Sequence, residues 1–333
     1  MPQSTPHSHR LCTAPMMDWS DRHCRFFFRQ LSPHAVVYTE MVTTGALIHG
    51  DVERHLRFHP AEHPVALQLG GSEPVDLARC ATLGLAYGYD EVNLNCGCPS
   101  ERVQHGAFGA CLMAEPQLVA DCVKAMQDAV AVPVTVKHRL GIDSIEDYDF
   151  VRRFVETVAA ADCRTFFVHS RNAILKGLSP KDNRAIPPLK YDYVYRLKRE
   201  FPELGIVING GVEALRAIEQ HLQHVDGVML GRAAYHDPYV LAAAEAMLSS
   251  EPLPSRAQIV QSMFEYASEE VARGTSLRAI ARHMLGLYHG QPNARLWRRM
   301  LSDAGMLAAN RTELLLNAVL AVESAEAEIA AVA

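Results

Sequence analysis

Short apolar runs alternate with amphipathic segments through most of the chain, and this alternation predicts its architecture. Eight runs have the composition of buried β-strands, and they lie at Arg10–Pro15, Ala35–Met41, Val65–Leu69, Glu91–Asn95, Val134–His138, Thr165–His169, Gly205–Asn209 and Gly227–Leu230. Apolar residues at helical spacing predict helices between them, for example at Pro116–Val130, Glu146–Ala161 and Val212–His221. Eight apolar strands separated by helices favour a closed parallel (β/α)8 TIM barrel over an open doubly wound sheet.

The pattern changes after Asp237 and Pro238, where helical spacing continues without further strands. The polar, proline-bearing stretch Ser249–Ser255 is typical of a linker. We therefore expect residues 1–9 to form a flexible tail and residues 10–245 a barrel. Residues 246–333 should form a small all-helical C-terminal domain.

Composition indicates an ordinary soluble globular protein, with 333 residues of which 49% are hydrophobic and 21% charged. The sequence has no run of about eighteen apolar residues and no apolar signal segment, so we expect a cytoplasmic protein. Its eight cysteines are scattered, which indicates reduced thiols. The net charge of −6 argues against nucleic acid for the chain as a whole, although such a sum can hide a local basic face.

Polar residues follow the predicted strands, where TIM barrels carry their active sites. In chain order, the strand ends are Met16, Glu40, Gln68, Asn95, Lys137 with Arg139, His169, Asn209 and Gly231. A salt bridge is the structural alternative for Lys137, and a role in the core is the alternative for His169. Their position at the strand ends favours ligand binding for both.

The stretch from Glu91 to Ser100 runs from a strand into two cysteines held by Gly97 and Pro99. Such a turn can present the Cys98 thiol as an acid, a nucleophile or a metal ligand. We expect no metal site, because Cys96 and Cys98 lack a second Cys or His pair at zinc spacing. The alternative is that Cys98 only fills space in a tight turn.

Glycines follow the last two predicted strands, in Asn209-Gly210-Gly211 and in Gly231-Arg232. Barrels bind phosphate at these positions, where backbone N–H groups can approach it closely. Arg232 would add positive charge. The two turns together predict a phosphorylated ligand.

Two clusters of basic residues predict a large anionic partner. Between Val271 and Arg299 the chain has no carboxylate and six arginines, at positions 273, 278, 282, 295, 298 and 299. Like charges at helical spacing repel unless an anion meets them. A second cluster follows the sixth strand and consists of Lys176, Lys181, Arg184 and Lys190. Simple solvation of a surface is the alternative for each cluster.

In these features the chain resembles the tRNA-dihydrouridine synthases, flavoenzymes with an FMN-binding barrel and a helical tRNA-binding domain. The resemblance rests on segments along nearly the whole chain, namely Ala14-Pro-Met-Met17, Gln68-Leu-Gly70, Asn93-Leu-Asn-Cys-Gly-Cys-Pro-Ser100, Val136-Lys-His-Arg139, Val168-His-Ser-Arg171, Asn209-Gly-Gly211 and Gly231-Arg232. The Cys-Gly-Cys98-Pro-Ser run and the segment Gly290–Met300 are similar to the A subfamily, which acts on uridines 20 and 20a of the tRNA D-loop.

The resemblance implies roles for individual residues. The implied FMN ligands are Pro15, Met16, Met17, Gln68, Lys137, His169, Asn209, Gly210, Gly211, Gly231 and Arg232. NADPH, or else NADH, would reduce the flavin, which would pass hydride to C6 of uridine while Cys98 protonates C5. The residues expected to contact tRNA are Asn95, Arg139, Lys181, Arg184, Arg295 and Arg298.

Three other functions stay open at this point. A flavin barrel could act on a free pyrimidine or small enone, although this would not explain the arginine-rich helices. A barrel lyase without flavin could use Lys137 as a Schiff-base amine. The chain could also bind tRNA without catalysis.

Overall fold

The computed structural model describes residues 8–100, 103, 106–145, 147–250 and 252–332. Most of the predicted flexible tail, residues 1–7, lies outside this range, as does residue 146 at the start of one predicted helix. Within the described residues the chain forms two compact units. Residues up to 18, 35–212 and 216–231 form the first unit, and residues 19–34, 213–215 and 232 onward form the second.

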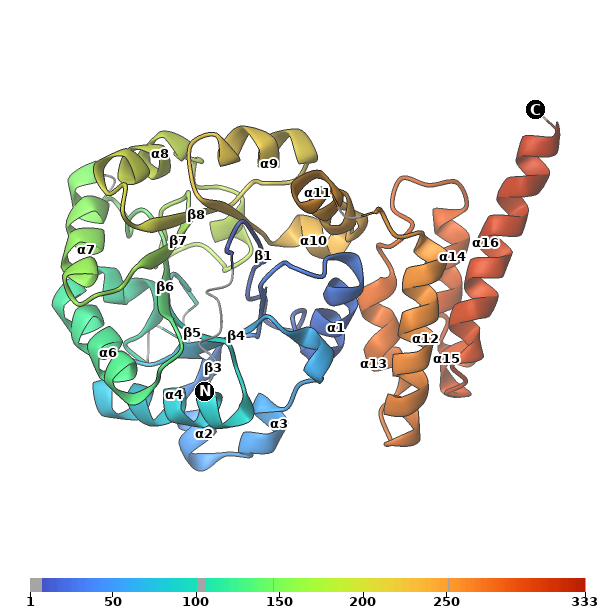
Figure 1. Cartoon of the computed structure of the whole chain (residues 1–333), viewed down its shortest axis with the longest axis horizontal. Coiled ribbons are helices and arrows are strands. Elements are labelled where there is room, and N and C mark those ends of the chain that lie inside the picture. The colour runs from blue at the N-terminus through green and yellow to red at the C-terminus, as the bar shows by residue number, and fades with distance from the viewer. Residues whose placement is uncertain (1–7, 101–102, 104–105, 146, 251, 333) are drawn as a thin grey trace. The chain divides into compact units, whose positions relative to one another are not determined.

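The first unit confirms the predicted TIM barrel (Figure 1). Its strands are all parallel and, within the described residues, are β1 (Leu11–Thr13), β2 (Val37–Tyr38), β3 (Val42–Thr43), β4 (Val65–Gly70), β5 (Glu91–Cys96), β6 (Val134–His138), β7 (Thr165–His169), β8 (Gly205–Asn209) and β9 (Gly227–Leu230). They follow the order β1-β9-β8-β7-β6-β5-β4-β2, with β3 beside β4. Backbone hydrogen bonds of 3.0 and 3.1 Å join Val36 to Thr13 and Leu11 and bring β1 against the β2 segment.

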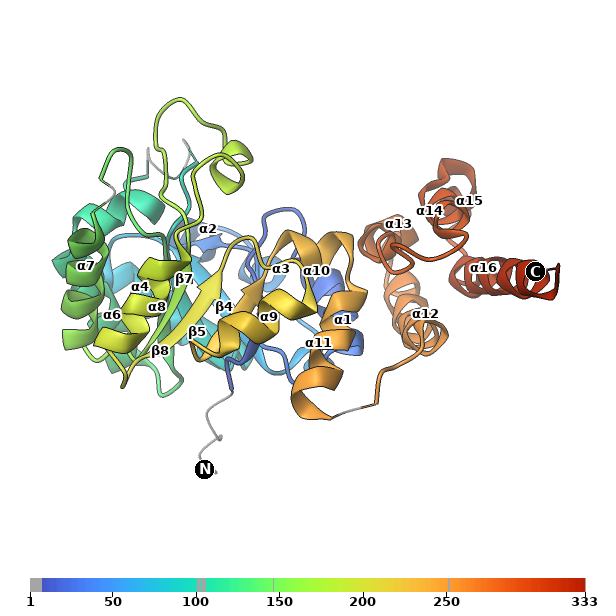
Figure 2. The same ribbon diagram turned by 90° about the horizontal axis from the view of Figure 1, so that it is seen from above.

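Helices surround the strands of this unit (Figures 1 and 2). They are α2 (Thr44–His49), α3 (Val52–Leu56), α4 (Pro74–Tyr87), α6 (Pro116–Ala129), α7 (Tyr148–Ala160), α8 (Tyr191–Glu200) and α9 (Leu215–Leu222). The bounds of β6, β7, β8 and β9 agree with those predicted from sequence. The first two strands are shorter than predicted, and the two-residue strand β3 is too short to leave a periodic signal.

The barrel interior is filled by side chains and is a core, not a pore. One buried layer is apolar and consists of Cys12, Ala14, Val36, Tyr38, Ala66, Phe167, Val207 and Met229. Polar residues occupy other inward positions, because alternate residues of a strand point to the same face. On β5 these are Glu91, Asn93 and Asn95, and all three side chains are buried.

The second unit consists of helices. They are α1 (Arg22–Leu31), α10 (Arg232–His236), α11 (Tyr239–Ser249), α12 (Arg256–Ala272), α13 (Leu277–Ala281), α14 (Ala294–Ser302), α15 (Ala304–Ala308) and α16 (Glu313–Val332). A capping box of Ser255 and Gln258 starts α12 directly after the predicted linker. The sequence places the domain boundary near residue 246, whereas the compact units group α10 and α11 with the later helices. The predicted boundary stays a prediction. No helix in the described part of the chain is long and apolar enough to cross a membrane.

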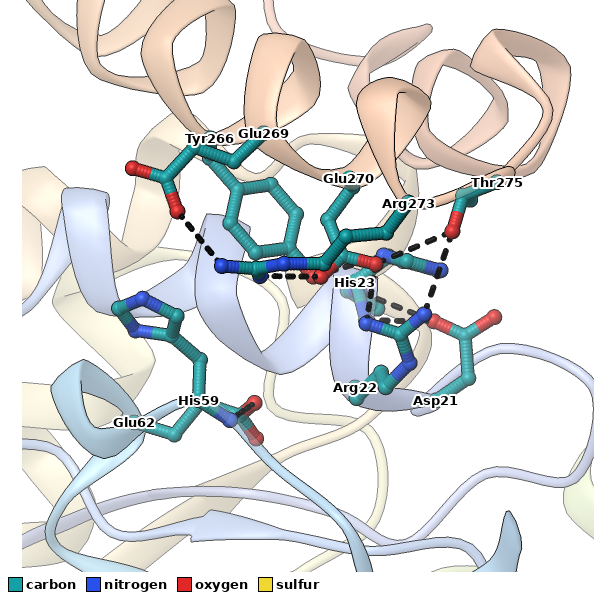
Figure 3. A network of polar contacts seen from close by, with 11 residues as sticks. Asp21, Arg22, His23, His59, Glu62, Tyr266, Glu269, Glu270, Arg273 and Thr275 are labelled. Carbon is teal, nitrogen blue, oxygen red and sulfur yellow. Dashed lines mark hydrogen bonds and ion pairs between the residues drawn. The ribbon is translucent and has the colours of Figure 1, made fainter.

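Helix α1 follows β1 in the sequence but packs against α12 in the second unit (Figure 3). Arg22 Nη1 lies 2.5 Å from Glu270 Oε2, and His23 Nδ1 lies 2.7 Å from the Tyr266 hydroxyl. The ring of Phe26 stacks on Tyr266 with a centroid distance of 3.9 Å. A segment from the N-terminal part of the chain therefore helps to build the helical unit.

Candidate active site

The Cys98 turn begins where β5 ends and is held by the side chain of Asn95. The backbone N–H groups of Gly97 and Cys98 donate to Asn95 Oδ1 over 3.1 and 3.0 Å. The carbonyl of Cys98 accepts a hydrogen bond of 2.9 Å from the N–H of Ala110. The Cys98 thiol is partly exposed, and its Sγ lies 3.5 Å from Ser100 Oγ. The backbone is thus fixed while the thiol stays accessible.

Gly109 permits the close approach of the segment that holds this turn. Its φ is +73°, and a Cβ at this position would lie 2.7 Å from the Cys98 carbonyl oxygen. Cys96 differs from Cys98, because it is fully buried and lies within β5. Burial raises the pKa of the Cys96 thiol well above its ordinary value. Of the two cysteines, only Cys98 is available to a ligand.

Lys137 lies on β6 beside Asn95 and reaches across to β8. Its Nζ donates a hydrogen bond of 2.9 Å to Asn209 Oδ1. Burial, together with the charge of Arg139, lowers the pKa of Lys137 to about 7. No carboxylate in the described residues forms an ion pair with Lys137, so the salt-bridge alternative is wrong for those residues. Among the described residues, the amine is therefore held by a neutral amide and not by a carboxylate.

His169 ends β7 and pairs in register with Asn209. Burial lowers its pKa well below the ordinary value, and the nearby charges of Arg139 and Lys137 lower it further. The imidazole is therefore neutral at physiological pH. Its ring forms no hydrogen bond with the described residues, which leaves its nitrogens available to a ligand.

The turn after β8 requires glycine at two successive positions. Gly210 has a φ of +102°, and a Cβ there would lie 2.5 Å from Cδ2 of His169. Gly211 has a φ of +71°, and a Cβ there would lie 2.6 Å from the Tyr191 hydroxyl. Both positions combine a left-handed backbone with close neighbours, so larger residues are excluded. Gly211 is exposed and Gly210 is partly exposed, so a ligand can approach the backbone of this turn.

Gln68 on β4 joins the same group through Asn95. Its Oε1 accepts a hydrogen bond of 2.8 Å from Asn95 Nδ2, and its Nε2 donates to Asn93 Oδ1 over 2.7 Å. Sequence reasoning did not select Asn93 as a site residue. The signal was present, since Glu91, Asn93 and Asn95 place polar residues at alternate positions of an otherwise apolar strand.

The remaining predicted FMN ligands follow β1 and β9. Met16 packs against the apolar layer of the barrel, whereas Met17 is 56% exposed. A Cβ on Gly231 would meet only Ala14, at 3.7 Å. Pro15 lies just before Met16, and Arg232 is the first residue of α10 in the second unit.

Arg139 is a predicted tRNA contact, and the structure buries it between two loops, the turn after β5 and the β7–α8 loop. Only 3% of the residue is exposed. Its Nε donates to the Gly97 carbonyl, and its Nη1 donates to the carbonyls of Asn172 and Asn183, each over 2.9 Å. This arrangement indicates that Arg139 holds the loops together, while a contact with tRNA stays a prediction.

Lys181 and Arg184 lie in the long loop between β7 and α8, which projects from the barrel (Figure 2). Both residues are exposed. The loop folds around the buried side chain of Asn183, which accepts from the Ile174 N–H over 2.7 Å and donates to the Ile174 carbonyl over 2.8 Å. These contacts hold the basic residues on a defined loop.

Arg295 and Arg298 lie on the exposed face of α14, opposite the buried Trp297 and Leu301. The Trp297 ring nitrogen donates a hydrogen bond of 2.8 Å to the Met284 carbonyl, and this contact anchors the helix. The exposed face lines a pocket of about 550 Å³, whose residues are Gln291, Asn293, Ala294, Arg295, Leu296, Arg298 and Arg299. Within the described residues the three arginine side chains form no ion pair with a carboxylate.

Two arginines of the stretch Val271–Arg299, which itself contains no carboxylate, pair with carboxylates outside it. Arg282 lies 2.7 Å from Asp21, and Arg273 lies 3.3 and 3.2 Å from Glu269 and Glu270. The first partner comes from the cap of α1, and the others come from the preceding turn of α12. A count confined to the stretch itself could not include them.

Known proteins of one family are similar to this chain along nearly its whole length. A family model described as dihydrouridine synthase matches residues 12–323. The chain is 55% identical to a protein of Synechocystis sp. over 311 residues, which is 93% of each chain. It is 59% identical to a Pseudomonas syringae pv. tomato protein, over 89% of this chain and 88% of the relative. It is 54% identical to a Vibrio vulnificus protein, over 94% and 97%.

Each of these relatives is named tRNA-dihydrouridine(20/20a) synthase. The matches run through both compact units and include every strand of the barrel except the first residue of β1. This chain belongs to the dihydrouridine synthase family.

Proposed function

We propose that this protein reduces the C5–C6 double bond of uridine to dihydrouridine at positions 20 and 20a of the tRNA D-loop. The names of its relatives support this activity. The observation that carries the proposal is the group of side chains at the strand ends. Lys137 pairs in register with Asn95 and donates a hydrogen bond to Asn209. Asn209 in turn pairs in register with His169.

The same side chains fit FMN. Lys137 has no carboxylate partner in the described residues, and His169 is neutral and open to a ligand. The partly exposed Gly210 and the exposed Gly211 offer backbone that a phosphate could approach. Such a set suits a polar ring edge joined to a phosphate. Pro15, Met16, Met17, Gln68, Gly231 and Arg232 complete the proposed FMN ligands.

When bound, FMN supplies the hydride that adds to C6 of uridine. Cys98 acts as the general acid and gives its thiol proton to C5, so that the double bond becomes a single bond. Lys137 and Cys98 are close enough to interact electrostatically, because a thiolate at Cys98 would raise the pKa of the Lys137 amine. Lys137 therefore contributes positive charge near the acid.

Asn95 orients the substrate with the one donor it has left. Its Oδ1 is occupied by two backbone N–H groups, and one Nδ2 hydrogen is given to Gln68. The second Nδ2 hydrogen remains for a uracil oxygen. Asn95 thus binds the base as a donor while it holds the Cys98 turn as an acceptor.

The basic surfaces bind tRNA. Lys181 and Arg184 on the β7–α8 loop, and Arg295 and Arg298 on α14, contact phosphates of the substrate. A stacked uridine cannot reach the strand ends, so the target base turns out of its stack before reaction. NADPH, or else NADH, would supply the hydride to bound FMN before the tRNA is reduced, in a ping-pong cycle in the cytoplasm.

One observation favours a second candidate function, a lyase that forms a Schiff base. An amine with a pKa of about 7 is partly unprotonated at neutral pH, as that chemistry requires. Two measurements separate the functions. Purified protein that carries flavin absorbance and oxidises NADPH faster with unmodified tRNA supports the synthase. Colourless protein whose Lys137 is trapped by a carbonyl compound and borohydride supports the lyase.

Mapping the product tests the proposal directly. The protein, loaded with FMN, is incubated with NADPH and tRNA that lacks dihydrouridine, and the modified positions are mapped. We expect conversion at positions 20 and 20a only. Reduction of free uracil but not of tRNA would instead support the small-pyrimidine alternative, and tRNA binding without conversion would support a non-catalytic protein.

A further inference from the structure

A chain of hydrogen bonds runs through the barrel interior from a buried carboxylate to the Cys98 turn. It passes in order through Glu91, Thr135, Asn93, Gln68, Asn95 and the backbone N–H of Cys98, with donor–acceptor distances of 2.6, 2.8, 2.7, 2.8 and 3.0 Å. All of the side chains in it are buried, with at most 9% exposed. Apart from the two ends, every member donates once and accepts at least once along the chain.

Strand geometry produces this arrangement. Asn93 on β5 is the register partner of Gln68 on β4 and of Thr135 on β6, so the three side chains lie side by side. Glu91 and Asn95 are two residues away on either side of Asn93 and point to the same face. The chain thus crosses from one end of β5 to the other.

The two ends define the direction of every hydrogen bond. A carboxylate can only accept, and a backbone N–H can only donate. Glu91 Oε1 accepts from Thr135 and also from the Tyr38 hydroxyl, 2.6 Å away, while Oε2 lies 2.5 Å from His9 Nε2. Because Thr135 gives its hydrogen to Glu91, its oxygen is left to accept from Asn93.

We propose that Glu91 is a positioning residue for the active site, which acts through this chain on Gln68, Asn95 and the Cys98 turn. The proposal rests on the proposed role of Cys98 as the acid. Without an acceptor at position 91, the Thr135 hydroxyl is no longer committed to Glu91 and can donate to Asn93 Oδ1 instead. The Asn93 amide then reverses and turns its Nδ2 toward Gln68 Nε2, which is also a donor. The same donor–donor conflict then arises at Asn95, whose Oδ1 no longer accepts from the N–H groups of Gly97 and Cys98.

Four variants separate this role from a general effect on stability. Glu91→Met keeps the length of the side chain but removes the acceptor, and Thr135→Val removes the next link at nearly unchanged volume. Glu91→Gln should restore the chain, because its oxygen can face Thr135 and its amide can donate to a neutral His9. Thr13→Val is the control, since the Thr13 hydroxyl is equally buried in β1 and has no hydrogen-bond partner in the described residues.

Hydrogen exchange at the Gly97 and Cys98 amides is the first measurement, made on the full chain relative to exchange in β7 and β8. We expect about tenfold faster exchange at these two amides in Glu91→Met and Thr135→Val. Glu91→Gln and Thr13→Val should match the parent protein. If Glu91→Met does not fold, Thr135→Val alone decides. Unaltered exchange at Gly97 and Cys98 in Thr135→Val overturns the proposal.

Single-turnover reduction of tRNA uridine by pre-reduced protein is the second measurement. We expect about tenfold slower reduction in Glu91→Met and Thr135→Val, with recovery in Glu91→Gln. A uniform rise of exchange across the barrel, with no recovery in Glu91→Gln, would show a merely structural role. If the parent protein does not reduce uridine, the proposed function fails, while the exchange measurement still tests the chain of hydrogen bonds.

Discussion

Lys137 Nζ donates a 2.9 Å hydrogen bond to Oδ1 of Asn209, so a neutral amide holds a buried amine at the strand ends. An amide accepts the hydrogen bond without cancelling the charge. The cost of burial is visible in the pKa of Lys137, which falls to about 7. A negative charge that binds near this amine would therefore raise its pKa and favour its protonated form.

The lowered pKa of Lys137 predicts how the stability of the cofactor-free protein depends on pH. Between about pH 7 and the ordinary value of 10.5, the unfolded chain holds a proton on Lys137 that the folded protein does not. The free energy of unfolding should therefore rise with pH, by at most about 1.4 kcal/mol per pH unit. Urea unfolding at pH 7, 8 and 9 measures this slope.

Lys137→Met supplies the reference for this measurement, because it lacks the titrating amine. The stability of the parent protein relative to this variant should increase from pH 7 to pH 9. A difference that is independent of pH over this range would show that the amine titrates elsewhere.

The contrast between Cys98 and Cys96 predicts different effects of their substitution. Cys98→Ala should retain FMN and should still oxidise NADPH slowly. It should reduce tRNA uridine about 10²–10⁴-fold more slowly than the parent protein, because this is the usual contribution of a positioned acid. Cys96→Ala is the matched control, because Cys96 is buried away from ligands and should affect stability more than chemistry. Single-turnover kinetics on both variants checks this, and equal losses would contradict the assignment.

The geometry of Gly210 predicts that Gly210→Ala weakens FMN binding. The added Cβ would lie 2.5 Å from His169 Cδ2, so the turn or the ring has to move. Gly177→Ala is the control, because Gly177 has a similar φ of +88° but no atom within 4 Å of the added Cβ. Fluorescence titration of FMN should show loss of affinity only for Gly210→Ala. Equal affinities in the two variants would mean that the turn is not part of the phosphate site.

The exposed arginines of α14 predict the salt dependence of tRNA binding. Replacing Arg295 and Arg298 by Ala should weaken binding and lower the slope of log affinity against log salt, by roughly 0.7–0.9 for each lost phosphate contact. FMN content and NADPH oxidation without tRNA should not change. Arg273→Ala is the control, because its guanidinium already pairs with Glu269 and Glu270.

Filter binding over a range of salt concentrations measures both affinity and slope. If the double variant binds tRNA as the parent protein does, the arginines only solvate α14. Recognition would then depend on Lys181 and Arg184 in the β7–α8 loop.

Local sequence patterns were sufficient for the barrel and for much of its site. Buried strands leave short apolar runs, so β6 to β9 could be bounded from sequence. Because parallel strands end at one rim, the residues that follow them could be expected to meet. Lys137, Asn209 and His169 do so in the structure.

Contacts between distant segments could not be read in this way. Arg282 pairs with Asp21, which lies 261 residues away in the sequence. Helix α1 belongs to the helical unit because Arg22 and His23 contact Glu270 and Tyr266. Periodicity reports which face of a segment is buried but not which segment covers it. The inner chain from Glu91 to Asn95 depends in the same way on the register between neighbouring strands. Strand ends and apolar faces are local properties of the sequence, whereas the partners of buried polar groups depend on how the strands and helices pack.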